Sequence, residues 1–222
     1  MTGTAEPARG ARRWVLIALA VIAIAAVAFA IGRFSTFGQA ASVALPDTNS
    51  PEAGFSRDMQ AHHTQAIEMA MEIYRKTDDD ELRILSYDIA TAQSAQRGEM
   101  YDWLVKWGLS QSDGAMMVWM APLGDGHVHG DGSPLSPQEA DAAMGMATPE
   151  QLTALRDATG TEADCLFLEL MIRHHEGAVP MAQALLDLGS EPRALAVAQS
   201  MKDGQTAELD AMRSMQARLG CS

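Results

Sequence analysis

The sequence predicts an all-α protein with one N-terminal transmembrane helix and a four-helix bundle made of two duplicated helical hairpins. Three observations support this fold class. The stretch 55–70 recurs as 167–182, so matched positions are 112 residues apart. The uncharged run 14–32 contains 19 residues, close to the ~20 that a helix needs to cross a bilayer. Strand-like alternation of polar and apolar residues is weak, and aromatic residues make up only 5% of the chain.

The apolar run is the first predicted element. Three arginines precede it and only Arg33 follows it closely, so the positive-inside rule places the N-terminus in the cytoplasm and residues 34–222 outside. A cleaved signal peptide is the alternative, with small-residue cleavage sites at 28–30 and 40–42. The run is longer than the ~7–15 residues of a signal core, which favours a retained single-pass signal-anchor in the cell membrane.

Residues 34–49, rich in Ala, Ser, Gly and Pro, are predicted to be a linker after the cytoplasmic tail and anchor of residues 1–33. After Arg33 the chain has 12 Lys and Arg residues and 28 Asp and Glu residues, a formal charge of −16. This charge argues against nucleic acid as a partner, because phosphate contacts need a basic face. It is compatible with collecting cations, although an acidic surface also keeps an exported protein soluble.

The first hairpin is predicted over residues 50–108. Ser50 is a capping residue and Pro51 occupies the first helical position, a common way for a helix to begin. The second helix of this hairpin runs over about 80–107 and ends at Gly108.

The second hairpin is predicted over residues 161–222. Thr161 is read as the cap of its first helix, which runs to about Leu188, and its second helix covers about 191–219. The repeat extends into the second helices at the same offset. There Ile89, Gln93, Gln96, Met100 and Trp103 match Met201, Gln205, Glu208, Met212 and Met215.

The connection between the hairpins, 109–160, is long enough to suggest a function. It contains a predicted short helix at 148–158 with a capping box. His127 and His129 are separated by one residue in a loop of Gly and Asp, and they are weaker metal candidates. Its methionines either form a capture arm or pack onto the bundle: Met116, Met117, Met120, Met144 and Met146.

Two cysteines lie at ends of helices that should be close in space. Cys165 is near the start of one predicted helix and Cys221 follows the end of its antiparallel neighbour. In an oxidising compartment they can form a disulfide. The sequence leaves the pairing open, since either cysteine could stay a free thiol.

The duplicated stretch places histidines and methionines on one helical face in each hairpin. Imidazole nitrogen and thioether sulfur are ligands that soft or borderline metal ions prefer. Counted back from the turns, Gln93 and Gln205 lie level with the histidines and are predicted to accept their second N–H. The predicted metal ligands are Met59, His62, His63, Met69, Met171, His174, His175 and Met181.

The identity of the metal can be inferred from the residue that stands three positions before the first histidine of each pair. Di-iron bundles use Glu-x-x-His, whereas here Met59 and Met171 take that place. A thioether shifts the preference toward Cu(I), with Ag(I) or Cu(II) also accepted. The alternative is that the methionines only fill the core, as they often do in helical bundles.

These residues resemble the family known as domain of unknown function 305. The resemblance covers about residues 50–219 and rests on Phe55…Asp58-Met59…His62-His63…Met69-Ala70, on Gln93…Gln96…Met100…Trp103, and on Met171…His174-His175…Met181-Ala182. It implies a ferritin-like bundle that is exported or membrane-anchored, and copper or silver binding as in some members. The second copy departs from the first at Gly177 and Pro180, so the two halves need not be equivalent sites.

The expected function is extracytoplasmic copper binding, for storage, sequestration or transfer, without catalysis. Two other classes of function stay open: a metallo-oxidase in a helical bundle, and a metal-free interaction module. The sequence also leaves open whether the repeats form one metal site or two, the metal stoichiometry, a homo-oligomer, and the copper-trafficking partner.

Overall fold

The computed structural model describes residues 8–37, 45–124 and 127–221 and divides the chain into two units, 1–45 and 46–222. In the first unit, helix α1 (Ala8–Phe37) contains a span of 19 residues with mean hydropathy 2.9. This helix is long and apolar enough to cross a membrane, and a signal sequence would have the same properties. Its last residues, 34–37, belong to the predicted linker, while 38–44 lie outside the described residues.

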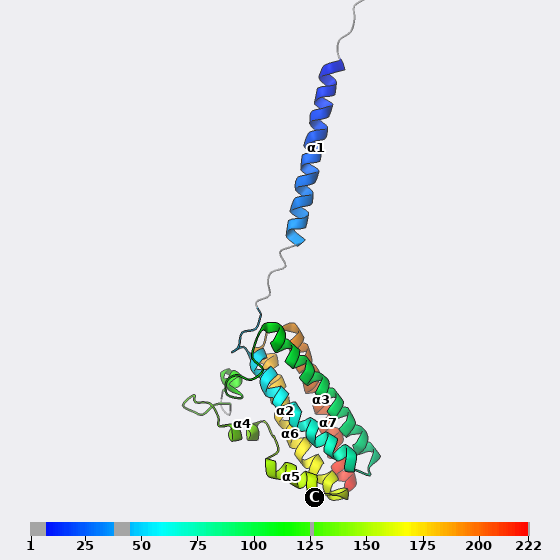
Figure 1. The fold of residues 1–222 in the computed structure, drawn as a ribbon, viewed down its shortest axis with the longest axis vertical. Helices are drawn as coiled ribbons and strands as arrows, with labels where there is room; N and C mark the ends of the chain where they lie inside the picture. The colour runs from blue at the N-terminus through cyan, green and yellow to red at the C-terminus, as the bar shows by residue number, and fades with distance from the viewer. Residues whose placement is uncertain (1–7, 38–44, 125–126, 222) are drawn as a thin grey trace, which may run out of the picture. The chain divides into compact units, whose positions relative to one another are not determined.

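The second unit is a bundle of four long helices (Figure 1). Helix α2 packs along α3, α6 packs along α7, and the two hairpins meet through α2 and α6. Between the described residues, strand-like pairing is limited to one isolated bridge, Val128 with Pro134. The predicted all-α fold is therefore confirmed. The four helices are α2 (Pro51–Lys76), α3 (Asp80–Trp107), α6 (Gly160–Leu188) and α7 (Pro192–Leu219).

Capping residues fix the helix ends. The side chains of Ser50, Asp79 and Glu191 each accept a hydrogen bond from the backbone N–H three residues later. Gly108 and Gly220 end α3 and α7 in the left-handed conformation, at φ 71° in both cases. The predicted cap of α6, Thr161, was wrong by two residues, because the helix begins at Gly160 and its N-cap is Thr159, which makes no side-chain capping bond.

A buried carboxylate fixes the antiparallel arrangement of α2 and α6. Glu52, in the first turn of α2, is only 2% exposed. It accepts hydrogen bonds from the backbone N–H groups of Ser190 and Glu191, at 2.5 and 2.9 Å, in the turn between α6 and α7. The start of the first hairpin is thereby tied to the turn of the second.

The connection contains a 3₁₀ helix, η1 (Val118–Leu123), and two short helices, α4 (Pro137–Ala143) and α5 (Pro149–Asp157); the sequence predicted only the last. Asp58 of α2 anchors its first part, accepting from Met117 N and Trp119 Nε1 at 2.8 and 2.9 Å.

The second part of the connection lies against α2 and α6. The amide of Gln65 pairs with both backbone groups of Ala147, at 2.7 and 3.0 Å. A β-carbon on Gly177 of α6 would lie 1.9 Å from the carbonyl oxygen of Met144, so only glycine allows this approach.

The two cysteines form a disulfide. Cys165 lies in α6 and Cys221 follows α7, with their Cα atoms 5.3 Å apart. The bond links the beginning of the second hairpin to its end, and it resolves the alternative that the sequence left open.

Candidate metal centre

Four histidines meet in the middle of the bundle. His62 and His63 lie on α2, His174 and His175 lie on α6, and all four are 0% exposed. The rings of His62 and His174, which occupy matched positions of the repeat, have centroids 3.6 Å apart. Each is 6.4 Å from the second histidine of its own helix. The four rings are thus successive neighbours in the order 63, 62, 174, 175, and we call them the histidine layer.

Three of these histidines have an acceptor at Nε2. His62 faces the carbonyl oxygen of Met144 at 3.0 Å, and His63 faces Gln96 Oε1 at 2.8 Å. His175 faces Glu208 Oε2 at 2.7 Å. Because each partner atom is an acceptor, Nε2 carries the hydrogen in all three rings, and Nδ1 of the neutral ring is left with a lone pair.

These lone pairs have no partner inside the protein. Nδ1 of His62, His63 and His175 is buried without a hydrogen bond, and so are both ring nitrogens of His174. Buried polar atoms are usually hydrogen-bonded, so unpaired ones call for a ligand or a water. Five imidazole nitrogens of one layer therefore lack a partner, and one of the two on His174 is an N–H because the ring is neutral.

Burial keeps the rings of His62, His63 and His174 neutral. Desolvation lowers the pKa of His62 to about 4 and the pKa of His63 to about 3, and it holds the pKa of His174 well below its usual value. At neutral pH these rings are therefore unprotonated, the state in which imidazole binds a metal ion.

The structure corrects the predicted partners of the histidines. Gln93 and Gln205 are buried, but none of their amide atoms has a hydrogen bond. Gln96 and Glu208 contact His63 and His175 instead. The estimate of level along the hairpin was wrong by about one helical turn, because it depends on how the chain leaves each turn. Gln96 and Glu208 occupy matched positions of the repeat and both carry a side-chain oxygen, which is the feature of the sequence that could have identified them as the acceptors.

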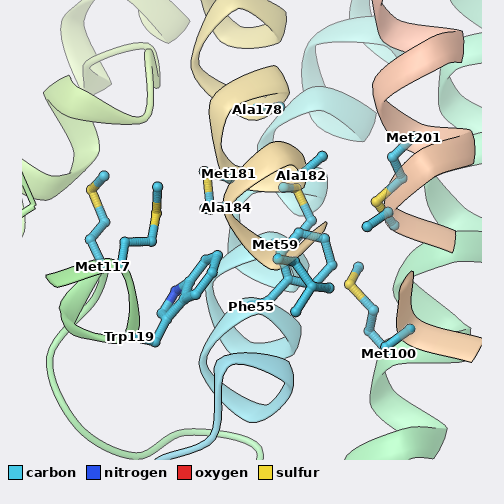
Figure 2. Packing of buried hydrophobic residues seen from close by; sticks show 14 of the residues in the cluster. Phe55, Met59, Met100, Met117, Trp119, Ala178, Met181, Ala182, Ala184 and Met201 are labelled. Atoms are coloured by element: carbon cyan, nitrogen blue, oxygen red, sulfur yellow. The ribbon is translucent and has the colours of Figure 1, made fainter. Parts of the chain in front are cut away.

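The predicted methionine ligands lie in two apolar clusters, one on either side of the histidine layer along each helix. The first cluster surrounds Phe55 and includes Met59 and Met181; the second surrounds Phe167 and includes Met69 and Met171. Figure 2 shows the first cluster, where Met100 of α3 and Met201 of α7 join Met59 and Met181. All four predicted methionines are at most 1% exposed.

The histidines do not enclose an ion by themselves. In the part of the chain that the structure describes, no three His, Cys, Asp or Glu side chains are grouped to hold a metal. A site at this layer would need thioether ligands beside the imidazoles, or a movement of the rings. The predicted ligands are thus buried on facing helices, while their binding of a metal stays a prediction.

The weaker candidates lie in the connection. His129 is exposed and has Nε2 3.4 Å from Glu139 Oε2, and His127 is half-buried with an unpaired Nδ1. Neither joins the four rings of the layer.

The comparison with protein families decides the membership of the chain. The profile of the domain of unknown function DUF305 matches residues 52–216. The protein belongs to the DUF305 family. Among proteins with curated descriptions, none matches this DUF305 chain.

Solved structures of DUF305 proteins have the same fold. A candidate secreted DUF305 protein of Streptomyces coelicolor is 34% identical, with a TM-score of 0.68 over 79% of this chain and 98% of that one. A DUF305 fragment from Deinococcus radiodurans is 28% identical, with a TM-score of 0.62 over 76% and 96%. CopM in its Cu(I)-bound form is 24% identical, with a TM-score of 0.54 over 76% and 96%, and at that identity the likeness concerns the fold.

Proposed function

We propose that this DUF305 protein binds Cu(I) or Ag(I) at the histidine layer and stores, sequesters or transfers the ion outside the cytoplasm. The observation that carries the proposal is the set of buried imidazole nitrogens without partners. A bound ion would satisfy lone pairs that no group of the protein satisfies.

The surrounding residues favour a soft ion. Methionines precede and follow the histidines on both α2 and α6, and thioethers prefer Cu(I) and Ag(I) over hard cations. CopM, which shares the fold, has been crystallised with Cu(I), Cu(II) and silver. Cu(II) is a third candidate cargo, because imidazoles accept it readily.

The proposed location is the outer face of the cell membrane, with α1 as a retained anchor and residues 46–222 outside the cytoplasm. The length and hydropathy of α1 support it, and so do the arginines before the apolar run. Cleaved secretion is the rival. N-terminal sequencing of the protein from its native membrane distinguishes them, since a cleaved protein would lack α1.

The metal proposal is tested by anaerobic Cu(I) titration of the full chain in detergent. A variant with His62, His63, His174 and His175 all replaced by Gln should lose most bound copper while its helical circular dichroism persists. The matched control replaces His127 and His129, which lie in the connection, and should bind as wild type does. Equal stoichiometry in all three proteins would refute the proposal. Should the fourfold variant not fold, His174→Gln alone still has to weaken binding.

We further propose that the protein binds the ion without turning it over. The rival is a metallo-oxidase, which would consume oxygen catalytically when Cu(I) is added. A second rival is a metal-free interaction module, which would show no thermal shift with copper. Oxygen uptake above the stoichiometric amount would favour the enzyme, and an unchanged melting temperature would favour the module.

A further inference from the structure

The two copies of the histidine motif differ in one contact. Nε2 of His63 faces the neutral amide oxygen of Gln96, whereas Nε2 of His175 faces the carboxylate of Glu208. Gln96 and Glu208 are matched positions of the repeat, 112 residues apart. The fold thus places an amide and a carboxylate in the same geometric role, on α3 and on α7.

Glu208 combines three properties. It contacts a ring that is 0% exposed, it is itself 23% exposed, and it accepts a hydrogen bond from Nε2 of His175. The basic residues that precede and follow it in the sequence of α7 have other partners: Lys202 donates to Gln183, and Arg213 pairs with Glu176. The carboxylate therefore keeps its charge available to the histidine layer.

A carboxylate at Nε2 changes what Nδ1 of the same ring can bind. An imidazole whose N–H donates to a carboxylate is held in one tautomer and is a stronger ligand, and loss of such a partner typically costs 10–100-fold in metal affinity. An amide holds the tautomer but adds no charge. Nδ1 of His175 is buried and has no hydrogen-bond partner, so this stronger metal ligand is free to bind an ion.

Charge balance favours the same half. Burying an uncompensated charge is costly. A monovalent ion near His175 would be neutralised by Glu208, while the same ion near His63 would leave a net positive charge in the core. Divalent ions would be left with excess charge in either half.

We propose that Glu208 is a positioning residue that makes the second copy of the motif, around His174 and His175, the tighter position for a soft monovalent cation. The inference rests on the proposed function. It adds which half binds first and why the two halves are not equivalent.

The test exchanges the two partners in the full chain and titrates with Ag(I), which is monovalent and redox-inert. Glu208→Gln should weaken the tightest Ag(I) binding about 10–100-fold. Gln96→Glu should create a second tight position. The variant with both substitutions should again have one tight position, now in the first copy of the motif. Its imidazole ¹⁵N signals should therefore shift first at His63 instead of His175.

These outcomes separate the inference from the proposed function. Wild type that binds no Ag(I) refutes the proposed function. If wild type binds Ag(I) but Glu208→Gln binds it equally tightly, only the role of Glu208 is refuted. The same holds if the first signals to shift in the doubly exchanged variant are still those of His175. A purely structural role would alter the melting temperature of the metal-free protein without moving the tight position. Gln96→Glu tests the same claim if Glu208→Gln does not fold.

Discussion

The two hairpins are copies in sequence, yet different interactions hold them in place. At the bundle end near the turn between α6 and α7, Glu52 accepts backbone hydrogen bonds across the hairpins. Its matched residue Asp164 lies at the opposite end, 5% exposed, with Oδ1 unpaired. Asp164 has one methylene fewer than Glu52, so the second hairpin repeats the position of the carboxylate but not its backbone contacts.

The covalent link shows the opposite asymmetry. The second hairpin is closed by Cys165 and Cys221, while the matched residues of the first are Ala53 and Leu109. The connection instead holds the first hairpin, through Asp58 and Gln65. The two copies therefore share the central histidine layer but are stabilised by different contacts.

The largest expected effect concerns the histidine layer that both hairpins share. His62, His63 and His174 have a lowered pKa in the folded protein, so the unfolded chain binds protons first as the pH falls. The free energy of unfolding should decrease from about pH 6.5 downward, by about 1.4 kcal/mol per pH unit for each group. Asp58 opposes this trend, because burial raises its pKa to about 6 and its protonation favours the folded state.

Urea unfolding of the metal-free protein between pH 7 and pH 5 measures this dependence. His63→Gln should flatten it, and His129→Gln, at the surface, should not. A stability that is independent of pH, or that rises on acidification, would contradict the expectation.

The second effect separates the hairpins directly. Cys165→Ser combined with Cys221→Ser opens a loop with a sequence separation of 56 residues. The chain-entropy account of disulfides predicts a loss of about 4 kcal/mol in the free energy of unfolding. Urea unfolding with and without a reductant checks it, since wild type should lose as much on reduction while the variant should not respond.

The third effect tests the close approach of the connection to α6. Gly177→Ala would place a methyl group 1.9 Å from the carbonyl oxygen of Met144, and overpacking of this kind typically costs about 1–3 kcal/mol. Movement of Met144 would also remove the acceptor of His62. A melting temperature equal to that of wild type would show that the connection is not tightly packed there.

This contact marks the limit of what the sequence predicts. The repeat predicted that two histidine pairs would face each other, because matched positions on antiparallel hairpins meet near a common two-fold axis. The position of Met144 could not be predicted, since residues 109–160 have no counterpart in the repeat. Gln65 and Gly177 occupy matched positions, yet Gln65 forms hydrogen bonds to the connection while Gly177 leaves room for it. Only the path of the connection explains this difference.

The partners of the histidines were predictable in kind but not in register. An oxygen acceptor for a buried imidazole follows from chemistry, and Gln93 and Gln96, three residues apart on one helix, both offer one. Their matched residues, Gln205 and Glu208, do the same in the second hairpin. To choose between Gln93 and Gln96, one has to know how far α3 is shifted along its axis relative to α2. The turn at residues 77–79 sets this shift, and the sequence pattern does not predict it. The same reasoning separates Gln205 from Glu208.

The fourth effect compares the two buried carboxylates through variants that remove only charge. Burial raises the pKa of Glu52, but hydrogen bonds from Ser190 and Glu191 outweigh it and leave the pKa lowered. Glu52 therefore stabilises the fold above its unfolded pKa, and Glu52→Gln should cost about 1–2 kcal/mol at pH 7. Burial, with Asp78 and Asp79 nearby, raises the pKa of Asp164, so its charge destabilises the fold at pH 7.

Asp164→Asn should accordingly leave stability unchanged or slightly raise it at pH 7. Urea unfolding at pH 7 and pH 4 distinguishes the pair, because the loss in Glu52→Gln should shrink at the lower pH. Equal losses in both variants would mean that the two carboxylates have the same role.

The smallest effect makes one hairpin more like the other. Gly204 lies inside α7, a β-carbon there would meet nothing within 4 Å, and its matched residue in α3 is Ala92. Gly204→Ala should raise the free energy of unfolding by about 0.5–1 kcal/mol, because alanine loses less backbone entropy in a helix than glycine does. Ala92→Gly should lower it by a similar amount. If the two changes have the same sign, local helix propensity is not what these matched positions contribute, and contacts specific to each hairpin have to account for both.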